Sequence, residues 1–291
     1  MNAPLLEKAP AKINLSLRVL GRRADGYHEL ESLVAFADVA DALRLQGGAE
    51  DSLEITGPFA AKSGPAADNL VLKALAALRG RIDGLKAGCF LLEKNLPVAA
   101  GIGGGSADAA AALRALARAN NIALTDPRLM TAARSIGADV PVCLDPRSRV
   151  MRGVGELLSE PLDLPRLPAV LVNPGVALAT RDVFANFAAQ KGGRDLVDVP
   201  ARFDALIEFL CRHKNDLTDA AVACVPAIGG VIERLRASPG NRLVRMSGSG
   251  PTCFALFNST DEAAAAAKRL NSEQENWWVC ATIIGGAPGK S

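Results

Sequence analysis

The chain has 291 residues, and 49% of them are hydrophobic, which is enough for one large domain or two ordinary domains with full cores. Its 33 basic and 31 acidic residues leave a net charge of +2, so the chain has no general attraction to nucleic acid or to a membrane surface. No apolar run approaches the length of a membrane span, and we expect a soluble, cytoplasmic protein that binds small molecules. The six cysteines include no C-x-x-C pair, which predicts buried free thiols rather than disulfides or a metal site.

The N-terminal segment is predicted to form strands. Polar and apolar residues alternate over 12–20, and the polar face carries Lys12 and Asn14, which either face solvent or line a site. After a glycine turn come Tyr27 and His28, whose rings either stack on a bound base or belong to a partly buried strand pair. Further strands are predicted at 33–36, 38–45 and 53–56.

The most informative stretch is a predicted strand at 89–92, a glycine turn, and an alanine-rich helix from Ala109 onward. The turn reads Gly101-Ile102-Gly103-Gly104-Gly105-Ser106, and its missing side chains allow an anion to approach the backbone closely. The first N–H groups of a helix have no partners within the helix, and the helix dipole makes this end electropositive. The sequence therefore predicts a loop that binds phosphate without a lysine.

Known nucleotide motifs differ from this loop. A Walker A loop requires Gly-Lys-Ser/Thr at its end, whereas this loop ends in Gly105-Ser106-Ala107. The dinucleotide fingerprint G-x-G-x-x-G fits Gly101 and Gly103 but has Ser106 in place of its last glycine. Because Asp126 lies about twenty residues further on, as that fingerprint requires, a Rossmann fold stays open. A turn that only reverses the chain is another alternative, although a simple turn requires fewer glycines.

Two further helices are predicted, one before this loop in the sequence and one after the helix that follows it. One covers 70–78, with Asp68 or Asn69 as N-cap, and the other runs from Asp126, with Pro127 in its first turn, to about Ser135.

An isolated acid follows these helices. In Gly137-Ala138-Asp139-Val140-Pro141 it stands between small and apolar residues. Because an unpaired buried carboxylate is costly, Asp139 needs a partner such as the Lys12 ammonium, unless it caps a helix end.

A proline-rich stretch at 160–168 marks a boundary between two predicted domains, residues 1–164 and 165–291. Within the second domain we predict strands at 169–172, 243–246, 253–257 and 277–284, and helices at 182–189, 201–211, 228–237 and 261–270. The stretch Ser247-Gly248-Ser249-Gly250-Pro251 joins two of these strands as an ordinary hairpin turn or as a loop packed against the first glycine loop.

Several motifs resemble those of the GHMP small-molecule kinases. They are Ala9-Pro10-Ala11-Lys12-Ile13-Asn14-Leu15, Gly21-Arg22-Arg23-Ala24-Asp25-Gly26-Tyr27-His28-Glu29-Leu30, Pro97 to Ala110, Gly137 to Pro141, Asn215-Asp216-Leu217 and Met246 to Gly250. The resemblance implies an α+β fold of two GHMP kinase domains, the first like domain 2 of ribosomal protein S5 and the second ferredoxin-like. It also implies phosphorylation of an alcohol by ATP and Mg²⁺. Asp25-Gly26-Tyr27-His28 points to a branch of the family that phosphorylates the 2-hydroxyl of an erythritol derivative carrying cytidine diphosphate.

The resemblance also implies roles for individual residues. Asp139 is the catalytic base, Lys12 is its partner, and Ser106 lies near Mg²⁺. The implied ATP-binding residues are Asn69, Leu70, Lys94, Pro97, Val98, Ala99, Ala100, Gly101, Ile102, Gly103, Gly104, Gly105, Ser106 and Ala107.

Other residues are implied to hold the acceptor. Tyr27 and His28 hold the cytosine, Phe184 forms a second stacking wall, and Asn14 lies beside the erythritol. Ala107 departs from the family pattern, which usually has a second serine there. Two other functions stay open: a GHMP kinase of the homoserine or mevalonate type, whose acceptor has no base, and a catalytically silent sensor of the same fold.

Overall fold

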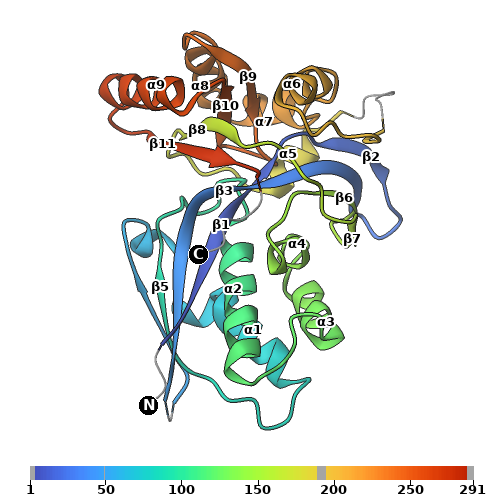
Figure 1. The fold of residues 1–291 in the computed structure, drawn as a ribbon, viewed down its shortest axis with the longest axis vertical. Coiled ribbons are helices and arrows are strands. Elements are labelled where there is room, and N and C mark those ends of the chain that lie inside the picture. The colour runs from blue at the N-terminus through green and yellow to red at the C-terminus, as the bar shows by residue number, and fades with distance from the viewer. Residues whose placement is uncertain (1–3, 49, 189–194, 287–291) are drawn as a thin grey trace. The chain divides into compact units, whose positions relative to one another are not determined.

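The computed structural model describes residues 4–48, 50–188 and 195–286 (Figure 1). The chain forms two compact units that alternate along the sequence. Unit 1 comprises Met1–Ala11, Val39–Val98 and Gly103–Pro146, and unit 2 comprises Lys12–Asp38, Ala99–Ile102 and Arg147–Ser291. Two strands, β1 (Leu5–Asn14) and β3 (His28–Gly47), contribute residues to both units. The domain boundary after residue 164 stays a prediction.

Unit 1 packs helices against a mixed sheet. Its other elements are β4 (Ser52–Thr56), the 3-10 turns η1 (Ala60–Lys62) and η2 (Ala66–Asp68), α1 (Leu70–Arg79), β5 (Gly88–Glu93), α2 (Gly104–Ala119), α3 (Pro127–Ile136) and α4 (Val140–Leu144). Strand β5 pairs parallel with β4 and antiparallel with the C-terminal part of β3. Helix α2 packs against α1, α3 and α4 (Figure 1). The buried Leu78 of α1, Phe90 of β5 and Leu113 of α2 belong to the core.

Unit 2 is built on antiparallel pairs. Its elements are β2 (Arg18–Arg22), β6 (Arg149–Gly153), β7 (Leu157–Leu158), β8 (Leu167–Asn173), α5 (Thr180–Ala185), α6 (Phe203–Arg212), α7 (Thr218–Cys224), α8 (Ala227–Arg236), β9 (Asn241–Met246), β10 (Cys253–Phe257), α9 (Thr260–Glu273) and β11 (Trp278–Ile284). Strands β11, β8, β10 and β9 lie in that order, and β2 and β6 pair with the N-terminal part of β3.

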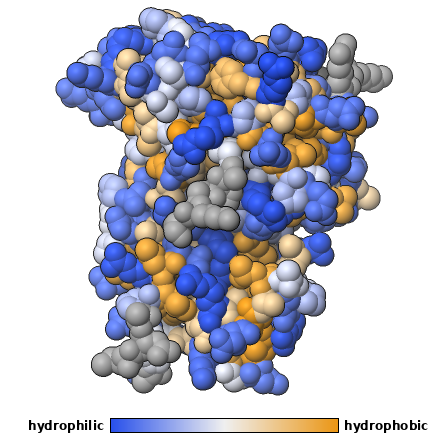
Figure 2. All heavy atoms as spheres, viewed as in Figure 1, coloured by the Kyte–Doolittle hydropathy of each residue, from blue (hydrophilic) through white to orange (hydrophobic). Residues whose placement is uncertain are grey.

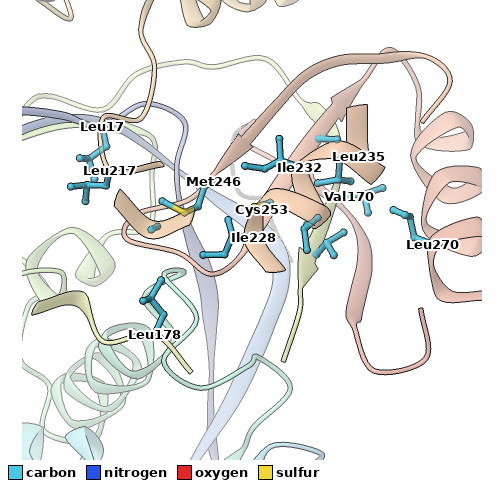
Figure 3. Packing of buried hydrophobic residues seen from close by; sticks show 14 of the residues in the cluster. Leu17, Val170, Leu178, Leu217, Ile228, Ile232, Leu235, Met246, Cys253 and Leu270 are labelled. Carbon is cyan, nitrogen blue, oxygen red and sulfur yellow. The ribbon is translucent and has the colours of Figure 1, made fainter. Parts of the chain in front are cut away.

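Helices α8 and α9 pack against the sheet of unit 2 and bury a large apolar cluster. Ile228, Ile232 and Leu235 of α8 lie with Val170 of β8 and Cys253 of β10 (Figure 3). On the surface in Figure 2, hydrophilic residues predominate and hydrophobic ones form smaller patches. Within the described ranges, no helix combines the length and apolarity that a membrane crossing requires.

The α+β prediction and most of the predicted elements are confirmed. Asn69 caps α1 by accepting a hydrogen bond from the Val71 N–H (2.9 Å), and Asp126 caps α3, which has Pro127 in its first turn. Residues 33–36 and 38–45 were predicted as separate strands, but they belong to the single strand β3. Strands β6 and β7 and the short helices α4 and α7 were not predicted. The last residue of the helix predicted at 182–189 lies outside the described residues, and α5 ends at Ala185.

The prediction of one strand over 12–20 is wrong, because β1 ends at Asn14 and β2 begins at Arg18. The N–H groups of Leu15 and Ser16 both point to the carbonyl of Leu33, at 2.8 and 3.5 Å, and such doubling interrupts a strand ladder. All six cysteines are free, as predicted, but only Cys143 and Cys253 are buried.

Candidate active site

The glycine loop has the predicted order of strand, turn and helix. Strand β5 ends at Glu93, and α2 begins at Gly104. Gly101 and Gly103 adopt left-handed φ values of 72° and 65°, and Gly103 is the N-cap of α2. The N–H groups of Gly104, Gly105 and Ser106 therefore open the helix without partners inside it.

Residues 99–102, which lead into and begin the glycine turn, are held by hydrogen bonds within unit 2. Ser247 Oγ donates to the Gly101 carbonyl (3.0 Å), and the Thr252 N–H donates to the Ala100 carbonyl (3.2 Å). The Lys12 N–H donates to the Ile102 carbonyl (2.9 Å). The stretch 247–252 thus joins the antiparallel strands β9 and β10 as a hairpin and also packs against the first glycine loop.

We expect Gly101→Ala to destabilise the protein more than Gly84→Ala. Both glycines have left-handed φ values, 72° and 68°, but an added Cβ would lie 2.5 Å from the Gly250 carbonyl oxygen at Gly101 and would meet no atom within 4 Å at Gly84. The left-handed backbone costs about 1–2 kcal/mol at each position, and the collision adds about 1–3 kcal/mol at Gly101 alone. Urea unfolding of both variants measures the difference. Equal losses would mean that the hairpin does not confine Gly101.

Lys12 and Asn14 begin a buried polar chain in unit 2, with exposures of 4% and 1%. Lys12 Nζ donates to Asn14 Oδ1 (3.0 Å), Asn14 Nδ2 donates to Ser32 Oγ (2.7 Å), and the Asn14 N–H donates to Ser247 Oγ (3.1 Å). The alternative of a solvated strand face is therefore wrong. These bonds fix the lysine beside the strand end where the ladder breaks.

Asp139 lies in unit 1 at the N-cap position of α4 and is half-buried. Its side chain makes no capping hydrogen bond, so capping does not explain an acid there. Lys12 belongs to unit 2, and its pairing with Asp139 stays a prediction.

The structure brings His28 and Phe184 together in unit 2. Their rings stack with centroids 4.6 Å apart and an interplanar angle of 20°. Tyr27 is 65% exposed, which leaves its ring accessible. Burial, followed by the charge of Arg22, lowers the pKa of His28 and so favours the neutral imidazole. A neutral imidazole can both donate and accept hydrogen bonds, as recognition of an uncharged base requires.

Three predicted ATP-binding residues gather at the N-terminus of α2 in unit 1. A Cβ added to Gly105 would lie 3.4 Å from Leu70 Cδ1, and one added to Gly104 would lie 3.6 Å from Lys94 Nζ. Asn69 directly precedes Leu70 and caps α1. Their contact with adenine stays a prediction.

Sequence reasoning missed two acids that bind Lys94. Lys94 Nζ donates to Asp41 Oδ2 (2.5 Å) and to Asp108 Oδ2 (2.7 Å), and all three side chains are buried. Burial raises the pKa of Asp108 to about 7 despite the nearby Lys94. Burial alone would lower the pKa of Lys94, but Asp108 and Asp41 outweigh it and raise that pKa. The available signal in the sequence was Asp108, an acid inside the alanine run of α2.

No group of three or more His, Cys, Asp or Glu side chains within 4–48, 50–188 and 195–286 could hold a metal ion. Mg²⁺ commonly binds through substrate phosphates with one or two protein ligands. The half-buried Ser106, in the first turn of α2, offers a hydroxyl beside the open helix amides. The residues present therefore suit a metal that is held mainly by a nucleotide.

Comparison with known proteins places the fold and these motifs in one family. Residues 69–145 match the GHMP kinases N terminal domain, and residues 199–276 match the GHMP kinases C terminal domain. The chain belongs to the GHMP kinase family and is an ATP-dependent kinase. The Rossmann alternative is therefore wrong, and Asp126 caps α3.

The relatives narrow this class to one kind of kinase. A 4-diphosphocytidyl-2-C-methyl-D-erythritol kinase of Rhodopseudomonas palustris is 54% identical over 97% of this chain and 95% of its own. One from Nitrobacter winogradskyi is 55% identical over 98% and 96%. A crystal structure of a 4-(cytidine 5'-diphospho)-2C-methyl-D-erythritol kinase matches with a TM-score of 0.81 and 37% identity, covering 97% of this chain and 100% of that one.

Proposed function

We propose that this chain transfers the γ-phosphoryl group of ATP to the 2-hydroxyl of 4-diphosphocytidyl-2-C-methyl-D-erythritol, in non-mevalonate isoprenoid precursor synthesis. The observation that carries the proposal is the identity of 54–55% to kinases of that name along nearly the whole chain. The stacked His28 and Phe184 beside the exposed Tyr27 support an acceptor that contains a base. Homoserine and mevalonate acceptors would give these rings no base to bind.

In this proposal, the glycine loop and the N-terminus of α2 hold the triphosphate. The Gly104, Gly105 and Ser106 amides face the phosphates, where the helix dipole favours negative charge. Asn69, Leu70 and Lys94 lie around the adenine. Bound Mg²⁺ would neutralise phosphate charge, with Ser106 as its nearest protein group.

The acceptor is proposed to bind through unit 2 residues. The cytosine lies against Tyr27 and Phe184 and hydrogen-bonds His28, while Asn14 lies beside the erythritol. Asp139 accepts the proton of the 2-hydroxyl, and Lys12 stabilises the charge that develops there. Phosphoryl transfer needs mainly positioning and charge neutralisation, so these groups suffice without a covalent intermediate.

An assay that couples ADP formation to NADH oxidation tests the proposal. The purified chain is given MgATP with the cytidine-containing erythritol derivative, with homoserine, or with mevalonate. We expect turnover only with the first acceptor. Turnover with homoserine or mevalonate would show that the proposed acceptor is wrong. ATP binding without turnover of any of the three acceptors would favour the silent sensor.

We expect Tyr27→Ala to raise the KM for the cytidine acceptor by about 10- to 100-fold, because stacking on a base contributes about 1–3 kcal/mol. The Kd for ATP should change less than about twofold, since adenine is assigned to other residues. Steady-state kinetics and ATP titration of one preparation give both values. Leu124→Ala, at an exposed apolar residue of unit 1, is the control and should leave both unchanged. Equal losses for the two ligands would refute the role of Tyr27.

A further inference from the structure

One buried cluster in unit 1 touches both ends of the stretch 97–107. Asp41, on β3, is 1% exposed, Lys94, just after β5, is 4% exposed, and Asp108, on α2, is 2% exposed. Lys94 lies three residues before the stretch begins, and Asp108 follows its last residue. Buried charges of this kind are rare unless they are paired.

The carboxylate of Asp41 fixes the residues that enter this loop. Its Oδ1 accepts the N–H groups of Asn95 (2.6 Å) and Leu96 (2.8 Å), which directly precede Pro97. Its Oδ2 accepts from Lys94 Nζ (2.5 Å). One side chain therefore binds the entering backbone with one oxygen and the lysine with the other.

The lysine connects this entrance to the helix that leaves the loop. Lys94 Nζ also donates to Asp108 Oδ2 (2.7 Å), at the start of the second turn of α2. A Cβ added to Gly104 would lie 3.6 Å from Lys94 Nζ and 3.8 Å from Asp41 Oδ2, so the cluster lies against the first residue of α2. The open amides of that helix begin at this residue.

The cluster is poorly suited to stability alone. Two carboxylates share one ammonium, and Asp108 Oδ1 is buried without a hydrogen-bond partner among the described residues. A buried ion pair of this kind is often no more stabilising than apolar residues of similar volume, whereas its directed bonds fix the relative position of the segments that carry it. Position is what a phosphate loop needs, because amides must lie close to where the phosphate oxygens bind.

We propose that Asp41, Lys94 and Asp108 are positioning residues for ATP, which bind both ends of the loop 97–107 together and so place the α2 amides. This inference rests on the proposed assignment of that loop to the triphosphate. None of the three side chains needs to touch the nucleotide phosphates for the inference to hold.

Two isosteric variants test the inference, because they differ in which bond they break. In Asp41→Asn, the single amide oxygen cannot accept from both the backbone and Lys94, so the NH₂ group would face either the ammonium or the backbone N–H groups, and the connection between them is lost. In Asp108→Asn, the oxygen can still accept from Lys94, and the NH₂ takes the place of the unpartnered Oδ1. We therefore expect the Kd for a non-hydrolysable ATP analogue to rise at least tenfold in Asp41→Asn and less than threefold in Asp108→Asn.

Calorimetric titration of the full chain with the analogue and Mg²⁺ gives the Kd, and thermal melting verifies that each variant is folded. Leu78→Ala, at a buried residue of α1, controls for lost stability and should leave the Kd of the folded protein unchanged. At saturating ATP, kcat in Asp41→Asn should stay within about threefold of the wild-type value, although the Kd rises. A merely structural role would instead lower kcat together with ATP affinity.

Equal Kd values in Asp41→Asn and wild type would overturn the inference, as would equal losses in the two isosteric variants. If Asp41→Asn does not fold, the same titration of Asp41→Glu decides, because a displaced carboxylate should weaken binding by several-fold and an unchanged Kd would refute positioning. Binding does not depend on the acceptor, so a wrong acceptor assignment leaves this result intact. If the wild-type chain binds no analogue, the loop assignment fails and the inference fails with it.

Discussion

Asp139→Asn is expected to lower kcat by about 10²- to 10⁴-fold, the range that a positioned general base contributes. The amide keeps the shape of the side chain but cannot accept the proton of the substrate hydroxyl. Because Asp139 is not assigned to ATP, the Kd for the nucleotide should change by no more than a few fold. Single-turnover kinetics with the cytidine acceptor measures the chemical step, and titration with the ATP analogue measures binding.

Asp83→Asn is the matched control for this variant. Asp83 is an exposed aspartate of unit 1 in the turn between α1 and β5, where a substitution should change neither kcat nor stability measurably. A kcat for Asp139→Asn within tenfold of the wild-type value would remove Asp139 from the chemistry.

The partner assigned to Asp139 is tested by a double-mutant cycle. Lys12→Met keeps the length of the buried side chain and removes its charge, and it should also abolish transfer while ATP still binds. If Lys12 and Asp139 act on the same proton transfer, the double variant should be little slower than the slower single variant, because groups that act as a unit give non-additive losses. Losses that multiply would indicate independent roles.

Features fixed by neighbouring residues were predictable from the sequence. The caps of α1 and α3 at Asn69 and Asp126, and the glycine turn before α2, each depend on a few consecutive residues. The break between β1 and β2 was not predictable, because it depends on the Leu33 carbonyl, which lies on another strand. A strand pattern alone contains no information about such a partner.

The long-range contacts of the candidate site could not be predicted from local sequence patterns alone. The contact between His28 and Phe184 was expected only through the family resemblance, since the two residues are 156 positions apart in the sequence. Asp41 and Lys94 are 53 residues apart, and the strand pattern does not distinguish this buried acid and this buried lysine from charged residues on the surface. Where an acid interrupts an apolar stretch, as Asp108 does in α2, the sequence indicates that a partner is needed but not which one.

Lys94→Met is expected to lower the free energy of unfolding by about 3–5 kcal/mol, the usual cost of removing one partner from a buried ion pair. The methionine fills the volume of the lysine stem but leaves Asp41 and Asp108 buried side by side without a cation. Lys86→Met makes the same change at an exposed lysine of unit 1 and should cost less than about 0.5 kcal/mol. Urea unfolding of the two variants at one pH gives the comparison.

The loss in Lys94→Met should also grow with pH. Burial already raises the pKa of Asp108 to about 7 in the wild-type protein, and removing the ammonium would raise it further. A carboxyl whose folded pKa exceeds its unfolded value takes up a proton on folding, so its contribution to stability is complete below the unfolded pKa and is lost as pH rises through the folded pKa. The raised pKa of Lys94 keeps the wild-type ammonium charged throughout this range. Unfolding at pH 5.5 and pH 8 should therefore give a clearly smaller loss at pH 5.5, and an equal loss at both values would show that the two carboxylates do not depend on Lys94 for their charge.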